Sequence, residues 1–187
     1  RPESMSNARA VISGLGLVTS IGNDQDSVIA SLRELRSGIE PHEFQPGLDL
    51  PVKAAGTIKG FNTGATQWSG WTWPGTYRFT SDVLRGIPPH GLYALCAMEQ
   101  LIADSRLTAA ELQHESTGLF CSSAGSPRLL RHHLNQVHES RGARVAPMSV
   151  VSTIAGTLNF NLAAYYGIRG AVAGFSSACA STSQALG

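Results

Sequence analysis

Apolar residues recur every three or four positions in three segments of the chain, residues 24–38, 90–107 and 127–142. This spacing predicts three helices that each bury one face. Acidic residues open the first segment and Gly38 follows it, as expected at the two ends of a helix. The third segment begins at Pro127, a residue suited to the first position of a helix.

Short apolar runs alternate with these helices and predict strands. One begins at Ala10 and leads into a glycine-rich turn, and others lie at 52–60, 116–123 and 169–177. The last run is apolar from residue 170 to residue 175, which is typical of a strand buried on both faces. Before it, residues 147–167 are dominated by small side chains and predict a helix buried on several faces. Alternating strands and helices favour an α/β layered fold.

Residues 61–79 follow neither period and are crowded with glycine and threonine. They also hold all three tryptophans of the chain, Trp68, Trp71 and Trp73. We expect a long loop in which the tryptophans act as apolar plugs, with an aromatic cage for a substrate as the less favoured alternative.

Composition excludes several classes of protein. Only 14% of the residues are charged and the net charge is +1 without a basic block, so we expect no nucleic-acid partner. Three widely spaced cysteines indicate neither a disulfide framework nor a paired-cysteine zinc site, and we expect no cofactor.

No apolar run is long enough to cross a bilayer, so the prediction is a cytoplasmic protein without membrane contact. Residues 1–9 are expected to be disordered or to derive from cloning.

Cys179 is the candidate nucleophile because it lies among small residues between a predicted strand and a predicted helix. A nucleophile on such a sharp turn needs small neighbours, here Ala178, Ala180 and Ser181. The following helix would turn free N–H groups toward the sulfur and favour the thiolate, and the N–H of Cys179 could bind an oxyanion. A helix dipole supplies only about 0.3–2 kcal/mol, so a histidine must assist, and the sequence pairs none with Cys179. The alternative is a buried structural cysteine.

The segment FSSACASTSQALG, residues 175–187, resembles the nucleophile segment of the β-ketoacyl-acyl-carrier-protein synthases. These are condensing enzymes of fatty-acid and polyketide synthesis with a thiolase-type fold. Residues 10–39, 118–128 and 147–179 also match the family pattern, which is closest to the type I and II elongating synthases. The resemblance implies that residues 10–187 are the N-terminal half of an αβαβα layered fold with a mixed five-stranded sheet, and that the C-terminal half is absent.

Several residues take roles from this resemblance. Cys179 matches the cysteine that accepts an acyl group from acyl-carrier protein before the enolate from malonyl-carrier protein attacks it in a Claisen condensation. Ala124 falls where the family lines the acyl tunnel, and its small size hints at a medium or long acyl chain. Ile154 falls where a residue of the partner subunit closes the tunnel. Arg78 matches an arginine that holds the carrier protein, although the family's neighbouring lysine has no counterpart here.

The resemblance also implies a homodimer that pairs through residues 169–175. The family's two catalytic histidines, a lysine and the second oxyanion donor belong to the other half, so we expect this chain alone to be inactive as a condensing enzyme. Two alternatives stay open: a non-catalytic structural or chain-length partner in a heterodimer and, less favoured, a Cys/His hydrolase, whose local signature is missing around Cys179.

Three histidines close together in sequence, His132, His133 and His138, raise the question of a metal site. Adjacent histidines point to different faces of a helix, and no carboxylate accompanies them at ligand spacing. We expect a solvated or dimer-facing helix and no metal.

Overall fold

A computed structural model describes residues 9–44, 47, 49–143 and 147–187 of the protein. The α-helices are α1 (Gln25–Arg33), α2 (Ser81–Gly86), α3 (Pro89–Ser105), α4 (Ala109–Leu112), α5 (Pro127–Glu139), α6 (Thr157–Tyr166) and α7 (Ser181–Leu186). The strands are β1 (Ile39–Pro41), β2 (Ala54–Gly56), β3 (Leu119–Ser122) and β4 (Val172–Phe175). Short 3-10 turns cover Trp68–Gly70, Val151–Thr153 and Ala178–Ala180. Residues 1–9 are the segment predicted to be disordered or derived from cloning, and residues 1–8 of it lie outside the described residues.

The three helices predicted from periodicity are present, but α1 ends at Arg33, before the predicted boundary at Gly38. The prediction that each buries its apolar face is wrong for most of α1 and α5: Leu32 and Leu134 are 61% and 58% exposed. The ends of the helices follow the expected chemistry. Asp24 caps α1, since its carboxylate accepts a hydrogen bond of 2.7 Å from the Ser27 N–H. Pro127 occupies the start of α5, and α6 ends at Gly167, whose φ of 68° is the left-handed conformation of a helix C-terminus.

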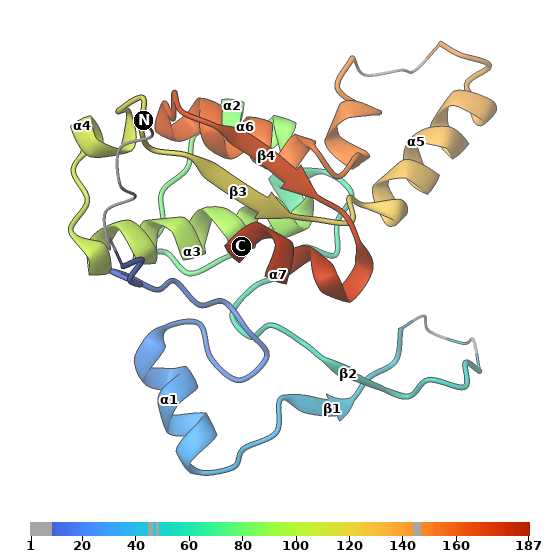
Figure 1. Cartoon of the computed structure of the whole chain (residues 1–187). Helices are drawn as coiled ribbons and strands as arrows, with labels where there is room; N and C mark the ends of the chain where they lie inside the picture. The colour runs from blue at the N-terminus through green and yellow to red at the C-terminus, as the bar shows by residue number, and fades with distance from the viewer. Residues whose placement is uncertain (1–8, 45–46, 48, 144–146) are drawn as a thin grey trace.

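A parallel pair of strands, β3 and β4, lies at the centre of the larger part of the molecule (Figure 1). Leu119 and Cys121 point to one face of this pair, where their side chains join the hydrophobic core with residues of α3 and α6. On the other face Ser122 Oγ lies 3.4 Å from Thr182 Oγ1 of α7. The described residues therefore form three layers, with α3 and α6 on one side of the strands and α7 on the other.

The strand predicted from Ala10 is wrong, and so is the five-stranded sheet for the described residues. Residues 10–18 have no strand partner, and the strands form two separate pairs, β1 with β2 and β3 with β4. Side chains of α3 take the place of a neighbouring strand: the Leu17 N–H donates to Gln100 Oε1 at 3.0 Å and the Leu15 N–H to Asp104 Oδ2 at 2.9 Å. A backbone satisfied in this way needs no ladder of hydrogen bonds.

The helix predicted over residues 147–167 is only partly formed. A 3-10 turn over Val151–Thr153 comes first, and α6 begins at Thr157. The Thr157 hydroxyl donates to the Val151 carbonyl and the Thr153 hydroxyl to the Val150 carbonyl. Such local side-chain bonds compete with helix formation and explain the break.

The tryptophan segment is irregular, as predicted, and its indoles serve as plugs. Trp71 is 5% exposed and its indole N–H donates to the Ala65 carbonyl at 2.8 Å. Trp68 and Trp73 are partly buried against the same core.

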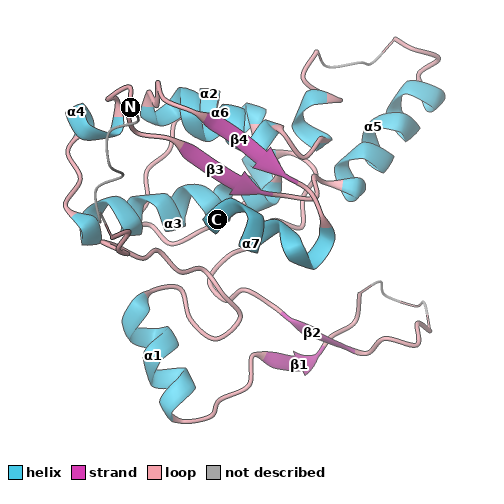
Figure 2. Ribbon diagram, in the orientation of Figure 1, coloured by secondary structure: helices cyan, strands magenta, loops and turns pink. Residues whose placement is uncertain are grey.

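Helix α1 and the antiparallel hairpin β1–β2 form a separate arm below the parallel strands (Figure 2). Within the described part of the chain, no helix has the length and apolar character needed to span a membrane.

Candidate active site

Cys179 lies in the 3-10 turn that joins β4 to α7, and its side chain is exposed. The residue before it, Ala178, has a φ of 47°, a left-handed conformation that costs an alanine about 1–2 kcal/mol. Ser181, 7% exposed, secures the turn: its hydroxyl accepts from the Ser177 N–H at 2.7 Å and donates to the Ala178 carbonyl at 2.8 Å. The predicted turn is present, and among the described residues the Cys179 thiol is exposed rather than buried.

The two other thiols are unsuited to nucleophilic chemistry. Burial raises the pKa of Cys96 to about 12 and that of Cys121 to about 11. Both remain protonated at neutral pH inside the core, whereas Cys179 faces solvent.

A second turn, residues 123–126, begins where β3 ends. Because β3 and β4 are parallel and Ser122 pairs with Phe175, this turn and the Cys179 turn leave the strands at the same end. In α/β folds ligands bind at such carboxyl ends of neighbouring parallel strands. Ala124 lies in this turn and is exposed.

Ile154 is brought to the second turn by backbone contacts of its neighbour, Thr153. The Thr153 carbonyl accepts a hydrogen bond of 2.8 Å from the Ser126 N–H. It also lies 2.3 Å from the place where a Cβ on Gly125 would stand. Ile154 itself is 51% exposed. The structure thus gathers Ala124 and Ile154, predicted from distant parts of the sequence, in one region.

Arg78 belongs to a different region, the end of the tryptophan segment. Its exposed side chain borders a hollow of about 370 Å³ that is lined mainly by aromatic residues, including Trp73, Tyr77 and Phe79. None of these lining residues belongs to the turns that hold Cys179 and Ala124.

Sequence reasoning missed His90, the second residue of α3. Its Nε2 lies 3.0 Å from Ser123 Oγ, and burial lowers the pKa of its imidazole. Pro89 marks the start of α3, but no pattern in the sequence pairs residue 90 with residue 123. Among the described residues, no histidine is within hydrogen-bond distance of the Cys179 sulfur, so the assisting base expected for the thiol is not supplied by this part of the chain.

His132 and His133 of α5 line different hollows, although their ring centroids are 5.5 Å apart. His132 lines a polar hollow of about 560 Å³ together with Gln136 and Glu139. His133 lines a smaller hollow of about 100 Å³, whose other walls include Trp68 and Met148.

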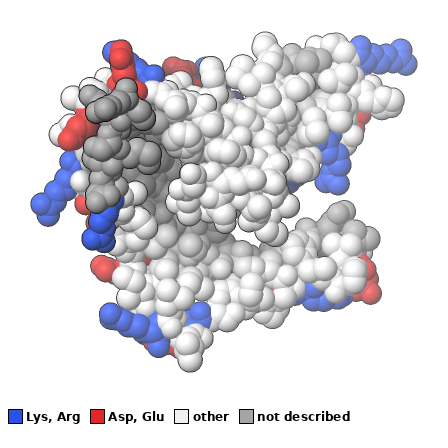
Figure 3. Space-filling view, viewed as in Figure 1, with Lys and Arg blue, Asp and Glu red and all other residues white. Residues whose placement is uncertain are grey.

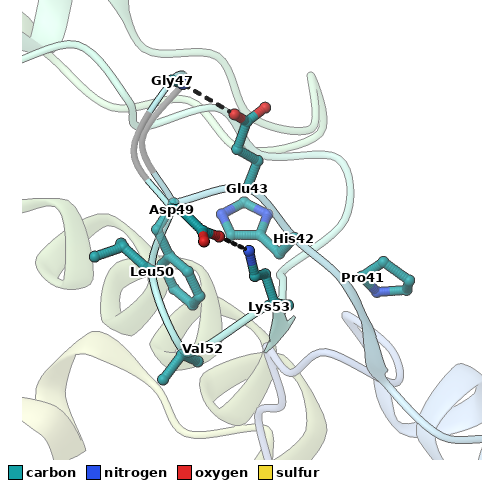
Figure 4. A pocket seen from close by; sticks show the side chains of 9 residues that line it. Pro41, His42, Glu43, Gly47, Asp49, Leu50, Val52 and Lys53 are labelled. Atoms are coloured by element: carbon teal, nitrogen blue, oxygen red, sulfur yellow. Dashed lines mark hydrogen bonds and ion pairs between the residues drawn. The ribbon is translucent and has the colours of Figure 1, made fainter.

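Another hollow, of about 590 Å³, lies at the end of the β1–β2 hairpin and not at the thiol (Figure 4). Lys53 forms an ion pair with Asp49 there, and Glu43 Oε1 accepts a hydrogen bond of 3.2 Å from the Gly47 N–H. Both carboxylates are therefore engaged within the hairpin, and Cys179 does not line this hollow.

Charged side chains are distributed unevenly over the surface. On the face that carries α7 and β4, lysine, arginine and acidic side chains lie mainly at the periphery, and uncharged residues cover the centre (Figure 3).

Comparisons with known proteins agree with this arrangement. The family model described as "Beta-ketoacyl synthase, N-terminal domain" matches residues 7–187. The 3-oxoacyl-acyl-carrier-protein synthase 1 of Escherichia coli K12 is 35% identical over 182 residues, which is 96% of this chain and 42% of that protein. The chain thus spans less than half the length of this relative.

Two solved structures confirm the α/β, thiolase-like fold. A crystal structure of a β-ketoacyl synthase from Burkholderia phymatum STM815 aligns with a TM-score of 0.73 at 24% identity, covering 94% of this chain and 41% of that one. The ishigamide ketosynthase/chain length factor aligns with a TM-score of 0.66 at 19% identity, covering 89% of this chain and 39% of that one.

Proposed function

Since the chain belongs to the β-ketoacyl synthase family, as its N-terminal domain, we propose that it carries the nucleophile of a β-ketoacyl-acyl-carrier-protein synthase. The observation that carries this proposal is the exposed Cys179 on a strained turn at the end of two parallel strands. No other described thiol is exposed.

The proposed reaction begins at the Cys179 sulfur. The thiolate attacks the acyl thioester of a carrier protein, the carrier thiol leaves with a proton, and the acyl group stays on Cys179. Decarboxylation of a malonyl thioester then releases CO₂ and forms an enolate. The enolate carbon attacks the Cys179 thioester, a carbon–carbon bond forms and the thiolate is released. The backbone N–H of Cys179 is the proposed oxyanion donor.

The groups that move protons in this reaction are proposed to lie outside the described residues, since no described histidine reaches Cys179. Activity therefore has to be measured on the protein as it occurs naturally rather than on the 187 residues in isolation.

Acylation of the thiol tests the proposal directly. The protein is incubated with an acyl-carrier thioester and its intact mass is measured. We expect the gain of one acyl group, lost in Cys179→Ser and kept in Ser176→Ala, a control at an exposed neighbouring position. Absence of acylation in the unchanged protein would overturn the proposal.

Ala124 and Ile154 are the proposed contacts of the acyl chain. Their exposure next to the thiol-bearing end of the strands supports this role. Ala124→Phe should slow acylation by long acyl thioesters more than by short ones, because the larger side chain occupies the space of the distal carbons. Equal slowing for all lengths would argue against it.

Arg78 is the proposed contact for the acidic carrier protein, supported by its exposed position on the rim of an aromatic hollow. Arg78→Glu should raise KM for carrier-bound substrates and leave KM for small acyl thioesters unchanged. Arg33→Glu, an exposed position in α1, is the matched control. An equal KM for carrier-bound substrates in both variants would remove Arg78 from the docking surface.

A homodimer that pairs through β4 is proposed as well. β4 is paired only with β3 among the described residues, and Val172 on it is 43% exposed, so one edge is available. Ala173→Lys should yield monomer or precipitate in light scattering, whereas Leu134→Lys on α5 should not. A stable dimer of Ala173→Lys would refute this pairing.

The second candidate function is a chain-length partner in a heterodimer, favoured by the similarity to the ketosynthase/chain length factor structure. An exposed cysteine is unnecessary for that role. Copurification with a second condensing-enzyme chain, together with no acylation of Cys179, would favour this candidate over the synthase.

A further inference from the structure

His90 contacts the turn that carries Ala124, through the side chain of Ser123. His90 Nε2 lies 3.0 Å from Ser123 Oγ, and the Gly125 N–H donates to the same oxygen at 3.1 Å. The Ser123 N–H in turn donates to the Phe175 carbonyl at 3.3 Å. Ser123 therefore joins helix α3, strand β4 and its own turn at one point.

The hydrogen bond between His90 and Ser123 is compatible with a neutral imidazole. The Ser123 oxygen already accepts a hydrogen bond from the Gly125 N–H, and it has one proton to donate. Burial favours the neutral imidazole of His90, since it lowers the pKa of that ring. A neutral ring carries one proton, on Nδ1 or on Nε2, and the serine hydroxyl can donate to Nε2 or accept from it, so either tautomer keeps the bond.

The other side of the turn is fixed by backbone packing. Gly125 has a φ of 75°, and its α-carbon lies so close to the Thr153 carbonyl that a Cβ would come within 2.3 Å of the oxygen. Ala124 is thus held between Ser123, which is tied to His90, and Gly125, which lies against Thr153. Ile154 is the next residue after Thr153, so the same contacts set the position of Ala124 relative to Ile154.

We infer that His90 is a positioning residue that, through Ser123, holds Ala124 in place beside the acyl group on Cys179 and so limits the range of acyl lengths that the thiol accepts. The inference rests on the proposed function, because it requires an acyl chain on Cys179. It adds a residue from α3, outside the segments that flank the nucleophile, to the determinants of substrate length.

The test compares acylation rates for short, medium and long saturated acyl thioesters in the natural protein, followed by intact mass. Without the bond to His90, the turn can move and the discrimination between lengths should weaken. The ratio of the fastest to the slowest rate should fall about two- to tenfold in His90→Ala, the equivalent of one buried hydrogen bond. Ser123→Ala should give a similar fall.

Two further variants separate positioning from a general loss of structure. His90→Gln places an amide, which can donate or accept, near the position of Nε2 and should recover most of the discrimination. His114→Ala removes an exposed histidine that bonds only locally to Ser116, and it should leave the ratio unchanged.

The outcomes are distinct. An unchanged ratio in His90→Ala, or an equal loss of rate for every acyl length, would overturn the inference while the proposed function stands. If His90→Ala does not fold, the ratio in Ser123→Ala and His90→Gln decides in the same way. No acylation of the unchanged protein at any length would overturn the proposed function, and the inference with it.

Discussion

Replacing Gly125 by alanine should destabilise the protein more than a glycine substitution usually does. Two independent costs combine at this residue. Its φ of 75° is left-handed, which costs an alanine about 1–2 kcal/mol. The new Cβ would also stand 2.3 Å from the Thr153 carbonyl oxygen, a backbone atom that cannot rotate away. Overpacking of this kind costs about 1–3 kcal/mol.

The expected loss is therefore about 2–5 kcal/mol in the free energy of unfolding. Thermal unfolding of the natural protein, followed by circular dichroism, measures it. Because the shift displaces Ala124 as well, acylation of Cys179 should slow for long acyl thioesters in the same variant.

Gly142 provides a matched control that separates the two costs. Its φ of 84° is also left-handed, but nothing lies within 4 Å of the place where a Cβ would stand. Gly142→Ala should lose only about 1–2 kcal/mol. Equal losses in Gly125→Ala and Gly142→Ala would refute the close approach of the 123–126 turn to Thr153, and with it the proposed placement of Ala124.

Three further outcomes are expected. Among the 187 residues, iodoacetamide at pH 8 should label only the thiol of Cys179. Burial raises the pKa of Cys96 to about 12 and that of Cys121 to about 11, so both stay protonated. Labelling of these residues that persists in Cys179→Ser would contradict the prediction. Ala178→Gly should raise the free energy of unfolding, measured in urea, by about 0.5–1 kcal/mol. The relief of the left-handed strain at residue 178 exceeds the cost of the added entropy of the unfolded chain. A loss of stability would show that the strain is absent. The pKa of His90 is lowered in the folded protein, so the unfolded chain binds a proton at a higher pH than the folded one. The free energy of unfolding should therefore decline as the pH falls below about 6.5 and through the folded-state pKa. An equally steep decline in His90→Gln would assign the effect to other groups.

Local rules predicted the helices because the signals for a helix are carried by its own residues. The cap at Asp24, the proline at 127 and the glycine at 167 all act within one turn of the helix that they bound. The turn around Cys179 was predictable for the same reason, since small neighbours permit a sharp bend whatever surrounds it.

The errors arise where the partner of a segment lies far away in the sequence. An apolar run such as residues 10–18 becomes a strand only if another strand supplies its hydrogen bonds. Here α3 supplies them through Gln100 and Asp104, more than eighty residues away. A pattern of apolar residues contains no information about this competition, because both arrangements satisfy the same backbone groups.

His90 was missed on similar grounds. Thirty-three residues separate it from Ser123, and its role depends on α3 beginning beside the carboxyl end of β3. Partial burial then lowers the pKa of the imidazole and favours its neutral form. A single histidine after two prolines gives no sign of either circumstance.

The two turns at the end of the parallel strands share one physical feature that links stability to function. Each contains a residue with a left-handed φ, Ala178 in the turn of the thiol and Gly125 in the turn of Ala124. The glycine at position 125 adopts a left-handed φ without a free-energy cost. The alanine at position 178 bears this cost, which a glycine there would avoid. Left-handed residues other than glycine persist where the surrounding contacts determine the backbone, and Ser181 provides such contacts around Cys179. The strain is thus located beside the thiol, where it projects Cys179 into solvent at the same end of the strands as Ala124.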